Sequence, residues 1–381
     1  MGPLSGIKVV EFEAIGPGPF AGMLLADMGA DVLLVDRPSS GDLGVNRARR
    51  VELMHRGKRS VTIDMKSSGG AEAALELIGR ADALIEGMRP GVMERLGIGP
   101  DAALARNPRI VYGRMTGWGQ NGPLAPRAGH DINYIALAGV LSAFGRKGEA
   151  PVPPLNLVGD FGGGGMLMGF GIACALVEAQ RSGRGQVVDA AMVEGASMLA
   201  TMFSGMLAAK SWTEERGVNI LDTGAPWYDT YRTKDGQYVC IGSIEARFYA
   251  ELLQRLGLEG EPLPAQHDRA GWPRLRERFT AAFASKTRAE WVAQFEGSDA
   301  CFAPVLTFSE ARRDAHNVAR NSFVSVAGIE QPAPAPKFSR TRPEIRRPPP
   351  ERGAGGREAL ADWGFAGADV ARLAALGLGA Q

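Results

Sequence analysis

Residues 7–37 read IKVVEFEAIGPGPFAGMLLADMGADVLLVDR: an apolar run, a turn of glycines and prolines, a helical stretch and a second apolar run. The pattern predicts strands at Lys8–Phe12 and Asp31–Val35 with a helix at Gly18–Gly29 between them. Further strands are expected at Val61–Asp64, Ala83–Ile85, Arg109–Tyr112 and Gln186–Met192, with helices between them. This alternation predicts an α/β fold with a mostly parallel sheet, whose ligands bind beyond the carboxyl ends of the strands.

The later part of the chain predicts a smaller domain and an extended tail. Asp235-Gly236, between the alternating segments Tyr228–Arg232 and Tyr238–Ile241, indicates a β-hairpin. Proline and arginine dominate 331–352, which suits neither a helix nor a central strand. We therefore expect a large Rossmann-like domain over 1–210, a small α+β domain over 225–320, and a strap with a C-terminal helix over 331–381 that returns to the large domain. Apolar helices are expected at Asp131–Phe144, Gly162–Gln180 and Val193–Lys210.

Composition and charge exclude several classes of protein. The 381 residues hold 43 Lys plus Arg and 42 Asp plus Glu, so a net charge of +1 gives no reason to expect a nucleic-acid partner. The three cysteines are far apart and form no Cys-x-x-Cys pair, which fits reduced thiols in the cytoplasm. The N-terminus does not read as a secretory signal, and the apolar run Gly165–Val177 is too short to span a bilayer. We expect a cytoplasmic protein without membrane insertion.

The turn at Gly16–Gly22 superficially matches a dinucleotide-binding fingerprint, since it follows a strand, opens a helix and precedes a strand that ends in Asp36. Pro17 and Pro19, however, lack the N–H groups with which such a turn binds a pyrophosphate. The glycine spacing is also one residue too long. We favour a tight structural turn over an NAD site.

Two residues stand out as candidates for acid–base chemistry. His130 begins an apolar helix, where the helix N-terminus lowers an imidazole pKa and favours a neutral base. Asp160 precedes four successive glycines, which are poor helix formers and suggest that the backbone must be approached closely. Exposed N–H groups there could stabilise an oxyanion. A packed histidine and a helix-capping aspartate are the alternatives. No two histidines have metal-ligand spacing, so no metal is expected.

Cations and methionines suggest further parts of a site. Arginine binds phosphate well because its planar fork bonds two oxygens, and four cations in the first half could gather at one sheet edge: Arg37, Lys66, Arg89 and Arg95. Taken singly, each of these cations is better explained as a solvated surface charge. Met198, Met202 and Met206 form a helical stripe, which is either core or an adaptable wall for an apolar substrate.

Four longer motifs resemble a known family. LADMGADV at 25–32 and RMTGWGQNGP at 114–123 are similar to the family III coenzyme A transferases. Within that family, GHDINY at 129–134 and PLNLVGDFGGG at 154–164 resemble the α-methylacyl-CoA racemases, above all those of the mycobacterial type. The resemblance covers nearly the whole chain, although the Arg-rich stretch 47–59 departs from the pattern.

The resemblance implies a racemase or epimerase that interconverts R and S 2-methyl-branched acyl-CoA thioesters through an enolate. The CoA thioester is then the substrate, and neither a metal nor another cofactor is implied. The resemblance also implies a homodimer of interlocked subunits, with an active site between the large domain of one subunit and the small domain of the other.

It further implies roles for single residues. His130 and Asp160 match the two catalytic bases, which serve the S and the R substrate respectively, while Glu245 matches an acid that orients the histidine and Asn156 the partner of the aspartate. The Asp160 amide and the glycine run could then stabilise the enolate. The CoA-binding positions are Arg37, Lys66, Arg89 and Arg95 near the adenosine and phosphates, with Asp131 and Tyr134 near the pantetheine.

Three other functions stay open. A CoA transferase of the same fold would use Asp160 as a nucleophile. His130 favours the racemase, because a transferase needs no second base there, and the glycine-rich lid of the transferases is missing after Cys240. An NAD-dependent oxidoreductase and a non-catalytic CoA-binding protein are the alternatives from other classes.

Overall fold

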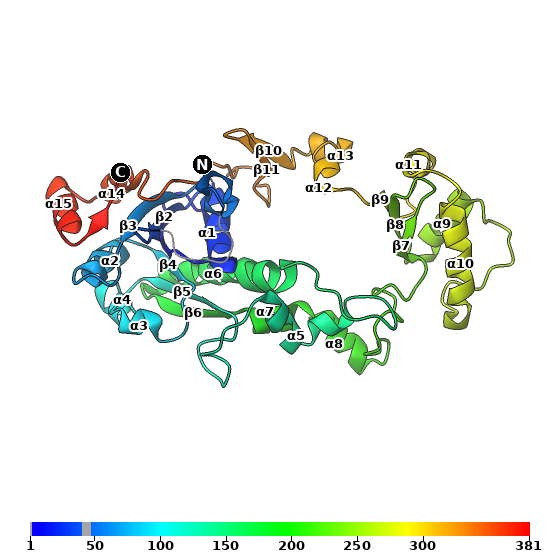
Figure 1. Cartoon of the computed structure of the whole chain (residues 1–381), viewed down its shortest axis with the longest axis horizontal. Coiled ribbons are helices and arrows are strands. Elements are labelled where there is room, and N and C mark those ends of the chain that lie inside the picture. The colour runs from blue at the N-terminus through cyan, green and yellow to red at the C-terminus, as the bar shows by residue number, and fades with distance from the viewer. Residues whose placement is uncertain (1, 40–46) are drawn as a thin grey trace. The chain divides into compact units, whose positions relative to one another are not determined.

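The computed structural model describes residues 2–39 and 47–381, which divide into two compact units (Figure 1). Unit 1 consists of Met1–Ala138, Pro154–Ala200 and Ala319–Gln381, and unit 2 of Gly139–Pro153 and Thr201–Val318. The C-terminal part of the chain thus belongs to the same unit as the N-terminal part. The segment 139–153, which the sequence analysis assigns to the large domain, groups with unit 2 instead.

A largely parallel sheet forms the centre of unit 1. In the described part of the chain it has seven strands in the order β12-β3-β2-β1-β4-β5-β6, and only β12 is antiparallel to its neighbour. The strands are β1 (Lys8–Phe12), β2 (Asp31–Asp36), β3 (Arg59–Ile63), β4 (Ala83–Glu86), β5 (Val111–Thr116), β6 (Gln186–Ala191) and β12 (Leu378–Gly379). The expected α/β class with a large parallel sheet is confirmed.

Helices cover both faces of this sheet. They are α1 (Pro17–Asp27), α2 (Gly70–Ile78), α3 (Val92–Arg95), α4 (Pro100–Arg106), α5 (Asp131–Leu137), α6 (Leu167–Ser182), α7 (Met192–Leu199), α14 (Gly356–Asp362) and α15 (Gly367–Ala375). Successive strand residues point to opposite faces. Accordingly Val10 packs in one core with Leu77 of α2 and Leu360 of α14, while Val9 packs in another with residues of α1 and α6. The sequence analysis identified neither α4 nor α14.

The glycine run lies in a π-helical segment, η4 (Leu157–Met166), that leads directly into α6. A Cβ on Gly195 of α7 would come within 1.9 Å of the carbonyl oxygen of Gly163, and one on Gly165 within 2.8 Å of the carbonyl oxygen of Pro17 in α1. The glycines therefore let three helical segments touch through their backbones, which confirms the expected close approach. The helical structure begins at Leu157, five residues before the expected start.

Together η4 and α6 form one helical stretch, 157–182, which is long and apolar enough to cross a membrane by length and composition. The run Gly165–Val177 is by itself as short as expected, but it forms only part of this longer helical stretch. Met168, Ile172 and Leu176 of α6 nevertheless pack into the core of unit 1 with residues of β4 and β5. In this fold α6 is thus a core helix.

Unit 2 contains a small antiparallel sheet of β7 (Tyr228–Arg232), β8 (Tyr238–Gly242) and β9 (Phe302–Pro304), so the hairpin is confirmed. Trp227, Phe279 and Trp291 are at the centre of its core. Its helices are α8 (Thr201–Ala208), α9 (Ala246–Leu256), α10 (Trp272–Phe283), α11 (Arg288–Phe295), α12 (Phe308–Ala311) and α13 (Ala315–Ala319). The single helix expected at Val193–Lys210 is in fact two, because α7 ends at Leu199 and α8 begins at Thr201.

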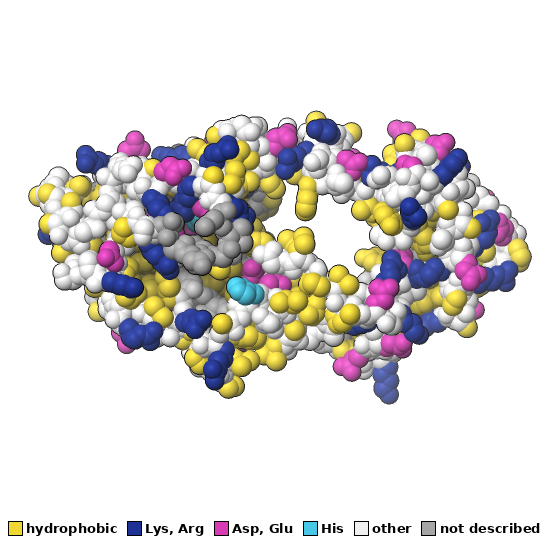
Figure 2. All heavy atoms as spheres, viewed as in Figure 1, with side chains coloured by type: hydrophobic (Ala, Val, Ile, Leu, Met, Phe, Trp, Pro, Cys, Tyr) yellow, Lys and Arg dark blue, Asp and Glu magenta, His cyan; other side chains and the backbone are white. Residues whose placement is uncertain are grey.

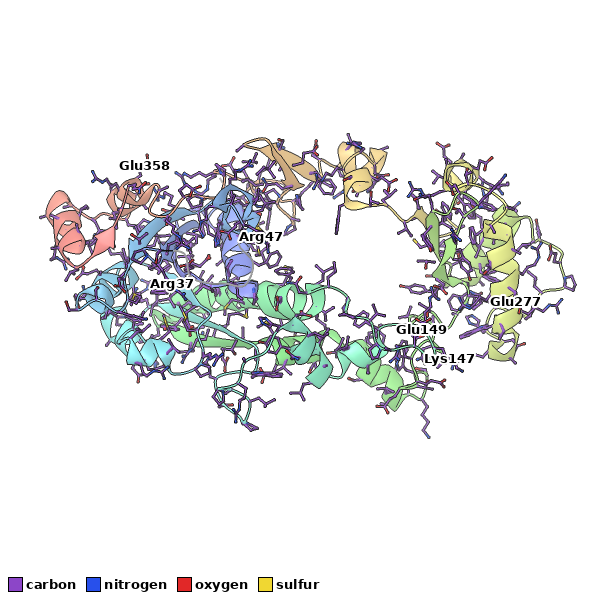
Figure 3. All side chains as sticks on the ribbon, viewed as in Figure 1. Arg37, Arg47, Lys147, Glu149, Glu277 and Glu358 are labelled. Carbon is purple, nitrogen blue, oxygen red and sulfur yellow. The ribbon has the colours of Figure 1, made fainter. Side chains whose placement is uncertain are left out.

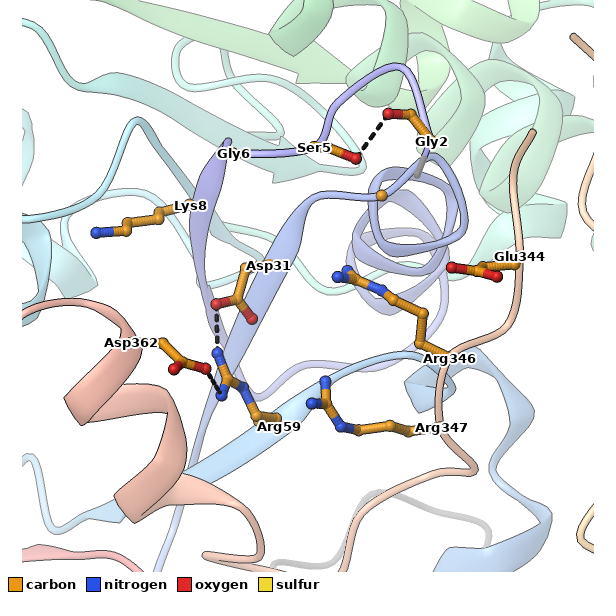
Figure 4. Close-up of a pocket in the computed structure, with 11 residues that line it drawn as sticks. Gly2, Ser5, Gly6, Lys8, Asp31, Arg59, Glu344, Arg346, Arg347 and Asp362 are labelled. Atoms are coloured by element: carbon orange, nitrogen blue, oxygen red, sulfur yellow. Dashed lines mark hydrogen bonds and ion pairs between the residues drawn. The ribbon is translucent and has the colours of Figure 1, made fainter. Parts of the chain in front are cut away.

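After β10 (Phe323–Val326) and β11 (Ile329–Pro332), the chain runs without helix or strand to α14, as expected of a strap. A cavity of about 320 Å³ lies between this strap and the starts of β1, β2 and β3 (Figure 4). There Arg59 pairs with Asp31 and Asp362, and the Trp363 indole donates to Asp31 at 2.8 Å. These contacts attach the C-terminal helices to the amino-terminal edge of the sheet.

Candidate active site

A cavity of about 1180 Å³ lies in unit 1, where the carboxyl ends of β1, β4 and β5 meet. This is the edge at which open α/β sheets bind their ligands. His130, Asp160 and Asn156 all line the cavity, so three of the four residues predicted to take part in catalysis lie in one place. On the face shown in Figure 2, a histidine side chain lies beside acidic side chains.

Asp160 projects from η4 and is half-buried. Burial raises the pKa of its carboxyl group, the amide of Asn156 lowers it by donating to Oδ2 at 3.0 Å, and the neighbouring charge of Asp131 raises it again. His130 acts on the carboxyl in the opposite, lowering sense, so the two groups are close enough to interact electrostatically. A Cβ on Gly16 would lie 3.2 Å from Oδ2, and this glycine therefore leaves room for the carboxylate.

His130 is the N-cap residue of α5, as its place at the start of an apolar helix predicted. Its backbone N–H donates to Oδ1 of Asn133 at 3.0 Å. This bond fixes the start of the helix, while the residue itself is exposed and lines the cavity. The imidazole is thereby available to a bound substrate.

Asp131, which was predicted to lie near the pantetheine, is buried and is not among the described residues that line the cavity. Its Oδ1 accepts the backbone N–H of Asp160 at 2.7 Å. The suggestion that this amide stabilises an enolate is therefore corrected: the hydrogen is already bound to a carboxylate. Sequence reasoning could not find the contact, because the two residues are 29 positions apart.

Tyr134 lines the cavity and is fixed on several sides. Its hydroxyl donates to the carbonyl oxygen of Gly129, and its ring meets that of Trp118 edge-on at 4.8 Å. Burial, with the charge of Asp160 as the next cause, raises its pKa to about 12. At neutral pH the group is a neutral phenol that can pack against a ligand.

The structure gathers a different set of cations from the one predicted. Arg89 lines the cavity, but Arg37, Lys66 and Arg95 are exposed residues outside its lining. Four arginines that the sequence analysis did not single out line it as well: Arg47, Arg49, Arg127 and Arg352. The Arg-rich stretch 47–59 was the available signal for two of them. Figure 3 places Arg37 and Arg47 on unit 1.

Glu245 belongs to unit 2, where it is the N-cap of α9 and exposed. The cavity described above is built from residues of unit 1. Glu245 is therefore not among the residues that the structure brings together there, and its role stays a prediction.

The acid that ends β2 does not fit a dinucleotide site. Asp36 receives two hydrogen bonds from Nη2 of Arg49, at 2.7 and 2.8 Å, and one from Ser60 Oγ at 2.6 Å. It has little capacity left for a ribose hydroxyl. A Cβ on Gly22 would come within 1.7 Å of Oε2 of buried Glu11, so this glycine serves packing. Both findings favour the structural turn.

Comparison with known proteins assigns the class. The model of CoA-transferase family III matches residues 4–355, and the chain belongs to this family. Its close homologues are α-methylacyl-CoA racemases: the mouse enzyme is 47% identical over 97% of this chain and 96% of its own, and the human enzyme is 44% identical with the same coverage.

Solved structures show the same fold. A CAIB/BAIF family protein from Brucella suis has a TM-score of 0.80 at 26% identity, covering 95% of this chain and 99% of its own. Rv3272 from Mycobacterium tuberculosis has a TM-score of 0.76 at 28% identity, covering 92% and 97%.

Proposed function

We propose that this protein is a racemase that interconverts R and S 2-methyl-branched acyl-CoA thioesters. The observation that carries the proposal is a single cavity lined by a histidine and an aspartate, His130 and Asp160. The names of the mouse and human homologues support the same reaction.

The reaction needs two groups that can each take and give a proton. One base removes the α-proton, the electrons move into the thioester carbonyl to form an enolate, and the other group returns a proton to the opposite face. His130 is an exposed residue that lines the cavity. Burial raises the pKa of Asp160, so this carboxyl can exchange a proton at a pH closer to neutral than an ordinary aspartate can. This route requires neither a metal nor a redox cofactor, because the thioester itself stabilises the carbanion.

The CoA part of the substrate would meet the arginines of the cavity. Arg89 and the exposed Arg47 and Arg127 suit phosphate oxygens, and Tyr134 suits the pantetheine arm. Roles for Arg37, Lys66 and Arg95 beside the nucleotide, and for Glu245 in orienting His130, remain part of this proposal.

The protein is further proposed to act in the cytoplasm as an interlocked homodimer. Apolar side chains that a lone chain exposes support a partner surface: Leu155, Leu157, Phe170 and Val177 are each about half exposed or more. All four lie in or beside η4 and α6.

Exchange of the α-proton tests the reaction directly. We expect one enantiomer of a 2-methylacyl-CoA, incubated with the protein in D₂O without an acceptor acid, to gain deuterium and lose optical purity. Transfer of CoA to an added carboxylic acid without exchange would instead show a transferase with Asp160 as nucleophile. Tight thioester binding without either reaction would leave a CoA-binding protein.

Asn156→Ala should change the pH dependence of the reaction. The Asn156 amide donates to the charged form of Asp160 and lowers its pKa, so removing it should raise that pKa further. A carboxylate base is lost on protonation, and the acidic limb of the kcat/KM profile should therefore move to higher pH. Profiles for the R enantiomer measure this shift. Asn121→Ala, at an exposed residue outside the cavity, should leave the limb in place, and an unmoved limb in Asn156→Ala would contradict the assignment.

A further inference from the structure

The C-terminal strap reaches the carboxyl edge of the sheet through one arginine. Nη2 of Arg352 donates to Oε1 of Glu13 at 2.6 Å, and Nη1 donates to Oε2 at 3.1 Å. Glu13 directly follows β1, and both side chains line the cavity that holds His130 and Asp160. This two-point ion pair joins positions 339 residues apart in the sequence.

Glu13 and Arg352 each also form a hydrogen bond with the backbone of Arg37, which follows the end of β2. Oε2 of Glu13 accepts the Arg37 N–H at 3.0 Å, and Nη1 of Arg352 donates to the Arg37 carbonyl oxygen at 2.9 Å. Both polar groups of one peptide position are thus fixed by side chains. The Arg37 side chain itself is 48% exposed, with Nε 4.0 Å from Glu13 Oε2. Its backbone is held while its guanidinium can still reach a ligand.

Burial and charge both favour this set of hydrogen bonds. The Glu13 side chain is only 3% exposed, and that of Arg352 is 22% exposed. Burial alone would raise the pKa of Glu13, but the hydrogen bonds from Arg352 and from the Arg37 N–H hold it below its usual value. Glu13 therefore stays ionised at neutral pH. Both terminal nitrogens of Arg352 already have protein acceptors, so this arginine is placed to position others.

We propose that Arg352 and Glu13 are positioning residues that hold Arg37 beside the cavity, where its guanidinium binds a phosphate group at the nucleotide end of CoA. The inference rests on the proposed function in taking CoA as the ligand and Arg37 as a contact of its phosphates; the roles of Glu13 and Arg352 are what it adds. The proposal makes the strap a part of nucleotide recognition. The strap is nevertheless distant in sequence from the proposed catalytic residues His130 and Asp160.

Calorimetric titration of Arg352→Gln with CoA and with pantetheine, which lacks the nucleotide, tests the proposal. We expect CoA to bind about tenfold more weakly, the effect of one lost charge-assisted hydrogen bond, and pantetheine to bind as it does to the unchanged protein. Glu13→Gln should give the same pattern. Arg352→Lys should recover part of the affinity, since a single ammonium group can keep one of the two partners. Arg342→Gln, at an exposed residue of the same strap, is the matched control and should bind both ligands normally.

The outcomes separate positioning from mere structural support. Equal losses for CoA and pantetheine would mean a general disturbance of the cavity and would overturn the proposal, as would unchanged CoA affinity in a folded variant. Thermal unfolding identifies a variant that fails to fold, and the judgement then rests on Arg352→Lys and Glu13→Gln. If the unchanged protein binds CoA but exchanges no α-proton, the proposed reaction fails while the titrations still decide this inference.

Discussion

Alanine at His130 or at Asp160 should slow racemisation of a 2-methylacyl-CoA by about 10²–10⁴-fold, the usual contribution of a general acid or base. Racemisation needs a proton removed from one face of the α-carbon and another returned to the opposite face. A base fixed on one side of the bound α-carbon reaches only one face, so in the two-base mechanism each single variant should lose the net inversion. Both residues line one cavity, but neither lies in the core that holds the sheet together, and the variants should fold.

The two variants should differ in the exchange that remains. If His130 serves the S substrate and Asp160 the R substrate, His130→Ala should still wash out the α-proton of the R enantiomer without inverting it. Asp160→Ala should show the reverse. Chirality and deuterium content, measured on the same sample in D₂O, separate the two events. Unchanged racemisation in either variant would exclude that residue as a base.

Asp160→Asn is the matched variant for the nucleophile alternative. It keeps the size of the side chain and can keep a contact with Asn156, but it can neither carry a proton as an acid nor form an anhydride. A protein that transfers CoA to an added acid and loses this transfer in Asp160→Asn, while it never exchanges the α-proton, would be a transferase.

Much of the large sheet could be predicted because its strands are apolar runs between turn signals. β1, β2 and β4 agree with the expected ranges to within one residue at each end. β5 was placed too early, at 109–112 in place of Val111–Thr116. The reason is Arg114, which lies in the middle of the strand as a charged residue. It is buried only because Glu86 and Glu94 bind its guanidinium, at 3.0 and 2.8 Å, and no local pattern shows those partners.

Site residues could be predicted only where they stand in a distinctive local motif. His130 and Asp160 stand in distinctive local sequences, and the structure places both on one cavity. Arg352 could not be found this way, because only the folded strap brings it to the end of β2. The spacing of the methionines could not show whether they belong to the core or to a binding surface. In the structure Met198 and Met202 are about half exposed and lie in different units, so neither is a core residue.

Lys58→Met should cost about 3–5 kcal/mol of the free energy of unfolding, the range for a buried ion pair that loses one partner. The side chains of Lys58 and Glu11 are both fully buried, with Nζ 2.6 Å from Oε2 of Glu11 and 2.9 Å from the carbonyl oxygen of Pro19. Methionine fills a similar volume but leaves the Glu11 carboxyl without a counter-charge between β1 and α1. Urea unfolding measures the loss as a lower midpoint, and Lys234→Met, at an exposed lysine, should stay within about 0.5 kcal/mol of the unchanged protein.

The double variant Glu11→Leu/Lys58→Met distinguishes the lost charge from a lost shape. Two apolar side chains of similar volume need no counter-charge, so most of the stability should return. The pH dependence gives a second check, because burial raises the pKa of Glu11 to about 7 even beside Lys58. A carboxyl whose pKa is raised in the folded state stabilises the fold below its unfolded value and loses that contribution as the pH rises through the folded value. Lys58 is the main group that opposes the raising effect of burial on the Glu11 pKa. The deficit of Lys58→Met should therefore be smallest in acid and grow toward neutral pH. A deficit that is the same at every pH would show that packing, and not the buried charge, makes Lys58 necessary.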